Sequence, residues 1–172
     1  IRDRAPGGVI PETVKDSLVE VNPHGLFLGS NGEIVGQPES LPEANDVVRI
    51  VPTIRNWEES GVIRSDLIDN LLVDPTAKQT HIADLVTLIV AQNYGGIDID
   101  YRGMNPELKQ EYANFIGELN EALPPTKRLS VRVDLPKQVA ADRWDTGVFD
   151  WRALGKAADA IKIPTPIDPR AY

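Results

Sequence analysis

The apolar residues of this chain fall into short runs separated by turn-forming residues, and two spacings alternate along it. Short runs rich in Val and Ile predict β-strands. The segments expected as strands are 25–29, 33–35, 47–54, 96–101, 129–134 and 160–163. The run at 47–54 is apolar on both faces, which favours a sheet that is covered on both sides.

Between these runs, apolar residues recur every three or four positions, the spacing of one helix face. The segments expected as helices are 11–21, 65–72, 74–92, 105–123 and 150–158. Ser65 should cap the second of these helices, and Asp74 should cap the third, with a proline following it. The buried stripe expected on that third helix consists of Ile82, Leu85, Val86, Ile89 and Val90. Trp144 and Trp151 are expected to pack against a helix.

Strands that alternate with helices predict a parallel sheet with crossover helices. The two architectures that fit are an open doubly wound sheet and a (β/α)₈ barrel. No glycine-rich phosphate loop follows any of the expected strands, which counts against a nucleotide-binding doubly wound fold. We treat residues 1–172 as a single domain, because no linker or low-complexity segment divides them.

The amino-acid composition argues against several classes of function. The 172 residues include 26 acidic and 18 basic side chains, a net charge of −8, which argues against a nucleic-acid partner. Cysteine is absent, so thiolate chemistry is excluded, and the absence fits a secreted bacterial or archaeal protein. The longest apolar run, 85–91, is far shorter than the ~20 residues of a membrane span. Because His24 and His81 are far apart in sequence, we expect no metal site, and no cofactor is expected.

The segment 95–102 carries the strongest candidate chemistry. Because side chains alternate along a strand, Gly96, Asp98, Asp100 and Arg102 should share one face. Two carboxylates on one buried wall cost stability, so the pattern indicates a functional site. The arginine on the same face cannot deliver a proton at neutral pH.

This segment resembles the signature of the family 18 glycoside hydrolases, the chitinase-like proteins. Their motif is D-G-x-D-x-D-x-E on the fourth strand of a (β/α)₈ TIM barrel. Segment 51–57 is similar to the family's third strand and following loop, and 66–75 to its next helix pair. The resemblance covers about 11–163 and is closest to the bacterial spore-germination-type members. It implies a partial barrel with about five to six βα units.

The resemblance also implies roles for the motif residues. In the family, the glutamate protonates the leaving oxygen, and the last aspartate orients the N-acetyl group that attacks within the substrate. Asp98 and Asp100 match the middle and last aspartates and are the candidate catalytic residues. Gly95 replaces the first aspartate, and Arg102 replaces the glutamate. We expect an ion pair between Arg102 and Asp100, and hence a degenerate site.

Substrate contacts are expected from Asn56, Trp57, Tyr101, Asp134 and Asp168. Trp57 could stack on a sugar or only cap the barrel rim, and Asp134 could face the barrel mouth or cap a turn. Asp98 and Asp100 could equally form a polar ladder that only holds the barrel together. Segment 163–168 stands where the family has a Met-x-Tyr-Asp-like stretch, but it lacks the tyrosine.

By the resemblance, one barrel strand precedes residue 1 and two follow residue 172. We expect these strands to come from the same longer chain or from a neighbouring chain, because five or six parallel strands cannot close an eight-stranded barrel. The expected partner is an N-acetylglucosamine-containing polysaccharide or peptidoglycan, and the expected location is extracellular or at the cell surface.

Three functions follow from these observations. The first is a non-hydrolytic, chitinase-like domain, a pseudoenzyme that binds a saccharide or serves as a structural module. The second is an active glycosidase whose acid comes from another loop, with Glu58, Glu59 and Asp134 as candidates. The third is a structural unit of an extracellular assembly that binds no glycan.

Overall fold

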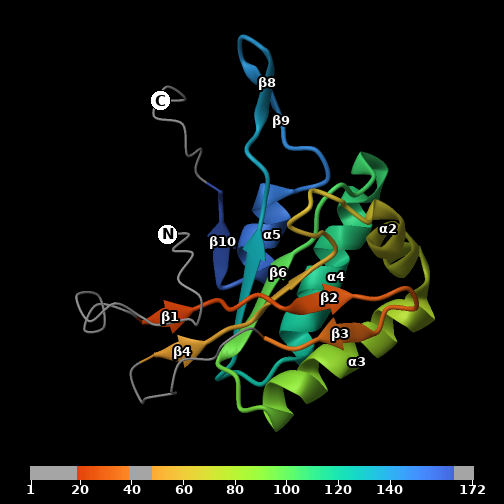
Figure 1. The fold of residues 1–172 in the computed structure, drawn as a ribbon. Coiled ribbons are helices and arrows are strands. Elements are labelled where there is room, and N and C mark those ends of the chain that lie inside the picture. Colours follow the sequence, from red (N-terminus) through yellow and green to blue (C-terminus); the bar gives the residue numbers. More distant parts are fainter. Residues whose placement is uncertain (1–18, 39–47, 165–172) are drawn as a thin grey trace.

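A computed structural model describes residues 19–38 and 48–164, in which helices cover one face of a sheet (Figure 1). Within these residues the main sheet has six strands in the order β10–β7–β6–β5–β2–β3. In chain order they are β2 (Leu26–Leu28), β3 (Ile34–Gly36), β5 (Thr53–Arg55), β6 (Gly96–Asp100), β7 (Arg128–Arg132) and β10 (Ala160–Lys162). Only β3 runs antiparallel to its neighbour, and all other pairs are parallel.

Two short strands, β1 (Glu20–Val21) and β4 (Arg49–Ile50), pair in parallel and lead into β2 and β5. The amide of Val51 donates to Val21, and the amide of Thr53 donates to Pro23, so the two pairs form one interrupted ladder. The described chain therefore contributes five parallel strand positions in sequential order. This is a partial barrel of the (β/α)₈ type, as the sequence predicted.

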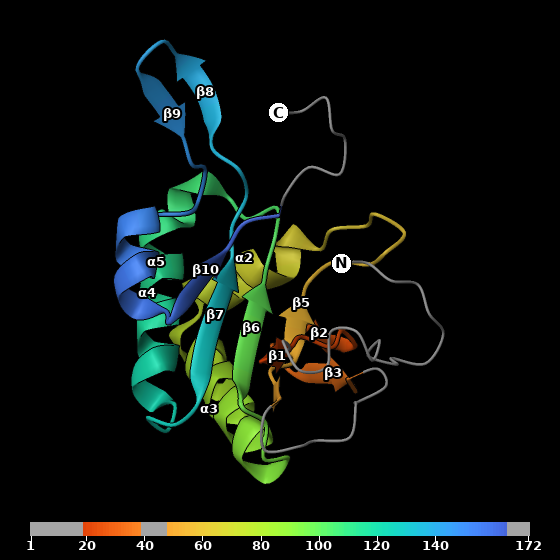
Figure 2. The ribbon, with the colours of Figure 1, turned by 90° about the vertical axis from the view of Figure 1, so that its left-hand side faces the viewer.

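In the described part of the chain, four α-helices lie on one side of the sheet (Figure 2). They are α2 (Ser65–Val73), α3 (Pro75–Ala91), α4 (Lys109–Ala122) and α5 (Trp151–Ala157), and the short 3₁₀ helix η1 (Pro106–Leu108) precedes α4. The strand residues Ile97 and Ile99 are fully buried in one hydrophobic cluster with helix residues such as Leu85 and Phe115. Burial of that apolar face leaves the polar residues of β6 on the opposite, concave face.

Helix starts follow from local chemistry. The carboxylate of Asp74 accepts hydrogen bonds from the amides of Thr76 and Ala77 at 2.8 and 3.1 Å, and Pro75 opens α3. This is the predicted cap. Ser65 was predicted to cap α2, but it is the first helical residue and Arg64 holds the cap position without a side-chain bond.

Three other predictions need correction. The helix expected at 11–21 does not extend to its predicted end, because Glu20–Val21 forms β1; residues 11–18 lie outside the described part. The single strand expected at 47–54 is divided, because Pro52 has no amide hydrogen for the ladder. On α3, Val90 is 52% exposed rather than part of the buried stripe.

The structure contains a hairpin that the sequence pattern did not predict. Strands β8 (Lys137–Ala140) and β9 (Arg143–Asp145) pair antiparallel and project from the carboxyl end of β7 (Figures 1 and 2). Trp144 lies on this hairpin and is 59% exposed, so the prediction that it packs against a helix is wrong. Trp151 begins α5 and packs against the hydrophobic core, as predicted.

Candidate active site

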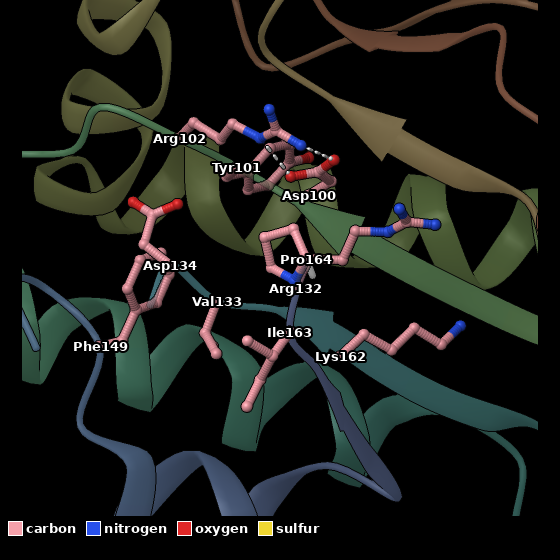
Figure 3. A pocket seen from close by; sticks show the side chains of 10 residues that line it. All are labelled: Asp100, Tyr101, Arg102, Arg132, Val133, Asp134, Phe149, Lys162, Ile163 and Pro164. Atoms are coloured by element: carbon pink, nitrogen blue, oxygen red, sulfur yellow. Dashed lines mark hydrogen bonds and ion pairs between the residues drawn. The ribbon is translucent and has the colours of Figure 1, made fainter. Parts of the chain in front are cut away.

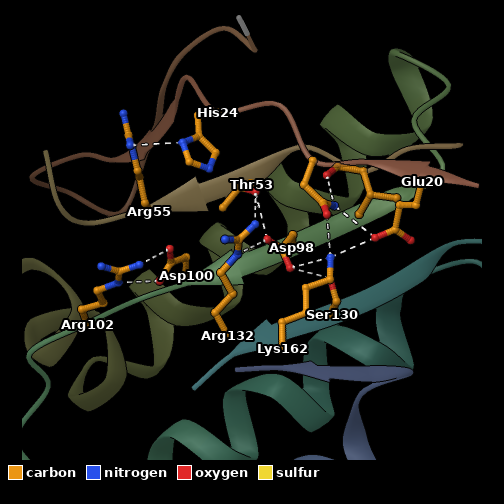
Figure 4. Close-up of polar contacts among 12 residues, drawn as sticks. Glu20, His24, Thr53, Arg55, Asp98, Asp100, Arg102, Ser130, Arg132 and Lys162 are labelled. Carbon is orange, nitrogen blue, oxygen red and sulfur yellow. Dashed lines mark hydrogen bonds and ion pairs between the residues drawn. The ribbon is translucent and has the colours of Figure 1, made fainter. Parts of the chain in front are cut away.

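The concave face of the sheet carries a row of polar residues on neighbouring strands (Figure 4). In the sheet register, Asp98 of β6 lies between Thr53 of β5 and Ser130 of β7, and Asp100 lies beside Arg55. Strand alternation directs these side chains to the same face. Asp98 and Asp100 therefore share one face of β6, as predicted, and the neighbouring strands contribute further polar residues to that face.

Asp98 is fully buried, and both of its carboxylate oxygens are bonded. Oδ1 accepts from the Ser130 hydroxyl at 2.5 Å and lies 3.1 Å from Lys162 Nζ. Oδ2 accepts from the Thr53 hydroxyl at 2.9 Å and from Arg132 Nε at 2.6 Å. Four groups on three neighbouring strands thus hold one carboxylate.

These partners also set the ionisation of Asp98. Burial raises the pKa of the carboxyl group, but the charges of Arg132 and Lys162 and the hydrogen bonds from Ser130 and Arg132 together outweigh burial. The net result is a pKa below the ordinary value. Asp98 is therefore a charged, fully paired carboxylate near neutral pH, and no proton is available from it there.

The network continues across the concave face to the first described strand. Lys162 Nζ, from β10, donates at 2.9 Å to both Glu20 of β1 and Asn22, which follows that strand. The Asn22 amide also donates to Glu20 and to the Val51 carbonyl. The two carboxylates, Glu20 and Asp98, thus face the two cations, Arg132 and Lys162, and the charges balance.

Asp100 has a separate partner. Arg102 Nε and Nη2 donate to its two carboxylate oxygens, each at 2.8 Å, in a bidentate pair (Figure 4). The Asp100 side chain is 2% exposed, whereas that of Arg102 is 34% exposed. The ion pair that the sequence predicted is confirmed.

Asn56 and Trp57 hold Arg102 in place. The Asn56 amide donates to the Arg102 carbonyl at 2.9 Å, and its oxygen accepts from the Arg102 amide at 2.8 Å. The Arg102 guanidinium lies 3.9 Å from the centre of the Trp57 ring, and that of Arg55 lies 4.7 Å from it. Both predicted substrate-binding residues are buried, so in this structure they support the arginines at the rim rather than offering a free stacking surface.

Replacing Arg102 with Ala should lower the free energy of unfolding by about 2 kcal/mol, because Asp100 loses both of its charge-assisted hydrogen bonds. Arg102→Lys should recover only part of the loss, since an ammonium group cannot make the bidentate contact. Urea denaturation of the three proteins measures both effects. Equal stability of Arg102→Ala and the parent would show that the pair contributes nothing.

A cavity of about 120 Å³ opens beside this pair at the carboxyl ends of β6, β7 and β10 (Figure 3). Its polar lining consists of Asp100, Arg102, Arg132, Asp134 and Lys162. Apolar surface comes from Val133, Phe149, Ile163 and Pro164, and Tyr101 also borders the cavity. The carboxyl ends of the strands are where barrel folds place their sites. Among the predicted substrate-binding residues that the structure describes, the exposed Asp134 is the one that combines solvent access with this cavity.

The Tyr101 side chain belongs to the opposite face of β6. It is fully buried, and its hydroxyl lies 2.7 Å from His81 Nε2. The ring packs among helix residues, with Phe115 at a centroid distance of 6.2 Å. In this structure the hydroxyl group is therefore part of the core, and contact with a saccharide is not open to it.

Other candidates lie apart from the cavity or outside the described residues. Glu58 and Glu59 are exposed on the loop after β5 and do not line this cavity. Asp168 lies outside the described residues. Within residues 19–38 and 48–164, no group of three or more His, Cys, Asp or Glu residues could hold a metal ion. In the same part of the chain, no helix has the length and apolarity to cross a membrane.

The site also contains basic residues that were not predicted from the sequence. Arg132 and Lys162 neutralise Asp98, and the buried Arg55 lies against Trp57 with its Nη1 3.4 Å from His24 Nδ1. A signal was present, since Arg132 and Lys162 lie at or near the carboxyl ends of two predicted strands. Their long reach across the sheet, however, depends on strand order and register, which the sequence did not supply.

Comparison with known proteins supports the fold. No protein-family model matches the sequence. The chain is 33% identical over 141 residues to the uncharacterized glycosylase YvbX of Bacillus subtilis, across 78% of this chain and 41% of YvbX. The chain thus spans less than half the length of this curated relative.

Solved structures agree. A chitinase from Chromobacterium violaceum superimposes with a TM-score of 0.73 at 21% identity, covering 91% of this chain and 51% of the chitinase. The spore cortex-lytic enzyme SleL of Bacillus cereus gives a TM-score of 0.72 at 19% identity, covering 92% of this chain and 40% of SleL. The chain therefore has a chitinase-like glycoside hydrolase fold of the TIM-barrel type and spans about half or less of the length of these two solved chains.

Proposed function

We propose that this chain belongs to a family 18-like domain that binds an N-acetylglucosamine-containing glycan without hydrolysing it. The observation that carries the proposal is the bidentate pair of Arg102 with Asp100 at the end of β6. In the family signature, the position of Arg102 supplies the general acid. Here the position holds a cation that is fixed on the neighbouring carboxylate.

The chemical consequence is large. A positioned general acid contributes about 10²–10⁴-fold to rate, and a guanidinium with a pKa above ~12 cannot replace it at neutral pH. The pair also occupies both oxygens of Asp100, which would otherwise orient an acetamido group and stabilise positive charge. Asp98 is paired with two further cations and cannot substitute for it.

The relatives support the ligand class. Their names describe a glycosylase, a chitinase and a spore cortex-lytic enzyme. A polysaccharide or peptidoglycan that contains N-acetylglucosamine is therefore the proposed ligand, and the proposed location is extracellular or at the cell surface, where such polymers occur.

The test measures hydrolysis and binding on the same preparation of the intact protein. Incubation with N-acetylglucosamine oligomers and with peptidoglycan should release no new reducing ends above the background, whereas calorimetry with the oligomers should show binding. Turnover comparable with that of an active chitinase would contradict the non-hydrolytic proposal. Absence of both turnover and binding would contradict saccharide recognition.

An active glycosidase is the second candidate, and one observation favours it. Asp134 is exposed and lines the same cavity as Asp100 and Arg102 (Figure 3). If hydrolysis is detected, Asp134→Asn separates the two functions. Loss of activity in that variant, with binding kept, would identify Asp134 as the acid.

A further inference from the structure

The turn between β2 and β3 carries the one asparagine of the sequence that glycine follows, Asn31-Gly32. The Gly32 amide donates to the Gly29 carbonyl at 3.2 Å, and the Gly29 amide donates to the Glu33 carbonyl at 2.8 Å. These two bonds close a hairpin that lies beside α3 (Figure 1). Asn31 is exposed at the tip of this hairpin, so water reaches its side chain.

The pairing of asparagine with glycine makes this turn chemically labile. The side-chain carbonyl carbon of an asparagine and the amide nitrogen of the next residue close a five-membered ring when they join. A side chain on that next residue hinders the ring, and Gly32 has none. The fold itself requires this glycine, because its φ is +83° and a Cβ would lie 3.0 Å from the Leu71 side chain of α2. The labile pair is therefore built into the hairpin.

The described contacts restrain the two reacting groups only weakly. Among residues 19–38 and 48–164, no hydrogen bond holds the side-chain amide of Asn31. The Gly32 nitrogen is restrained by the 3.2 Å bond to Gly29, which is at the long end of the range for such bonds. Once this bond opens, the Asn31 side chain is free to turn toward the Gly32 nitrogen.

We propose that Asn31 is a site of spontaneous deamidation, and that the modification is transmitted to the buried core through the Gly32 carbonyl. After a solvent base removes its proton, the Gly32 nitrogen attacks Asn31 Cγ. The N–Cγ bond forms, the Cγ–Nδ2 bond breaks, and the amide nitrogen leaves as ammonia with a proton from solvent. Water then opens the succinimide at either carbonyl, which gives aspartate or isoaspartate; in isoaspartate the main chain runs through Cβ and Cγ.

The Gly32 carbonyl connects the turn to the interior. It can only accept, so His81 Nδ1 on α3 donates to it, at 2.6 Å. His81 Nε2 accepts from the Tyr101 hydroxyl at 2.7 Å, and both side chains are fully buried. Isoaspartate adds one carbon to the main chain directly before Gly32 and so displaces this carbonyl. His81 then becomes a buried donor without its acceptor, which costs stability, and it is bonded to the residue between Asp100 and Arg102.

Ageing of the intact protein at about 37 °C and about pH 8, followed by peptide mapping with mass spectrometry, measures the modification. Asn31 should convert at least about tenfold faster than Asn93, an exposed asparagine that is followed by the bulky Tyr94, whose amide also donates a backbone bond. Asn31→Gln should abolish conversion at position 31, because glutamine would need a larger ring, and Asn93→Gln should leave it unchanged. Equal rates at Asn31 and Asn93 would overturn the site.

A second measurement tests the link to His81. The isoaspartate form, separated by chromatography, should unfold at a lower urea concentration than the parent and should lose the slowly exchanging Nδ1–H signal of His81 in NMR spectra. Asn31→Asp is the matched control, because it adds a charge beside the Glu33 carboxylate, 2.7 Å from the amide of residue 31, without lengthening the main chain. This variant should keep both the midpoint and the signal.

Two outcomes would overturn the link to the core. One is an isoaspartate form with the parental urea midpoint and the parental His81 signal. The other is an equal loss in Asn31→Asp, which would assign the effect to charge and not to the displaced Gly32 carbonyl. Neither measurement depends on glycan binding, so failure of the proposed function would leave this inference unaffected.

Discussion

Replacing Asp98 with Ala should lower the free energy of unfolding by about 3–5 kcal/mol, the usual cost of removing one member of a buried ion pair. The substitution leaves Arg132 and Lys162 facing each other across the concave side of the sheet without the carboxylate between them. The hydroxyl groups of Thr53 and Ser130 lose their shared acceptor as well. Urea denaturation followed by circular dichroism measures the change.

Two further variants separate charge from packing. Asp98→Asn keeps the volume of the side chain but not its charge, so it should be nearly as destabilising as Asp98→Ala. Asp66→Ala removes an exposed aspartate that also pairs with an arginine, Arg64, at 2.7 Å, and it should leave the urea midpoint unchanged. Near-parental stability of Asp98→Asn would show that the two cations do not need the carboxylate.

The same network explains why the sequence motif could be recognised, although not all of the partners that pair with its aspartates could be predicted. Alternation within 96–101 was sufficient to predict that Asp98 and Asp100 share a face. The ion pair of Asp100 with Arg102 was also predictable, because the two residues are close together in the sequence. The partners of Asp98 come from sequence separations of 32 to 64 residues, so their identity required the strand order β10–β7–β6–β5. A structural ladder and a ligand site look alike at the level of one strand.

Two other differences concern segments whose own sequence has a weak structural preference. The hairpin at β8–β9 escaped prediction because its exposed strands alternate only weakly between apolar and polar residues, and exposed strands lack the strong pattern of half-buried ones. Glu20–Val21 is extended because it pairs with the strand β4, and not because its own sequence favours a strand. In both cases tertiary pairing decided the structure of a segment with weak intrinsic preference.

Lowering the pH from 7 to about 4 should cost on the order of 3 kcal/mol of stability through one residue, His81, whose pKa is lower in the folded than in the unfolded state. This side chain is fully buried between the sheet and the helices. Nδ1 lies 2.6 Å from the Gly32 carbonyl, which can only accept, so Nδ1 carries the hydrogen and Nε2 accepts from the Tyr101 hydroxyl at 2.7 Å. The neutral ring thus satisfies both neighbours.

Burial lowers the pKa of His81 from 6.5 to about 4, against the opposing effects of the Gly32 carbonyl and the charge of Asp84. In the unfolded chain the imidazole should titrate near its ordinary value of about 6.5. Between these two values the unfolded state binds more protons than the folded state, so stability falls as the pH falls from about 6.5 to about 4. Above pH 6.5 both states are neutral at this residue, and it contributes no slope.

His81→Gln should remove this slope, because a glutamine amide offers a donor and an acceptor but no titrating group in this range. The variant should be less stable than the parent at pH 7, where the ring packs at 6.0 Å from Phe115, and the difference should shrink toward pH 4. Urea midpoints at half-unit pH intervals measure both curves, and NMR titration of the ring gives the pKa directly. Parallel curves would exclude His81 as the source, whatever the slope contributed by carboxylates such as Asp98, because both proteins keep those groups.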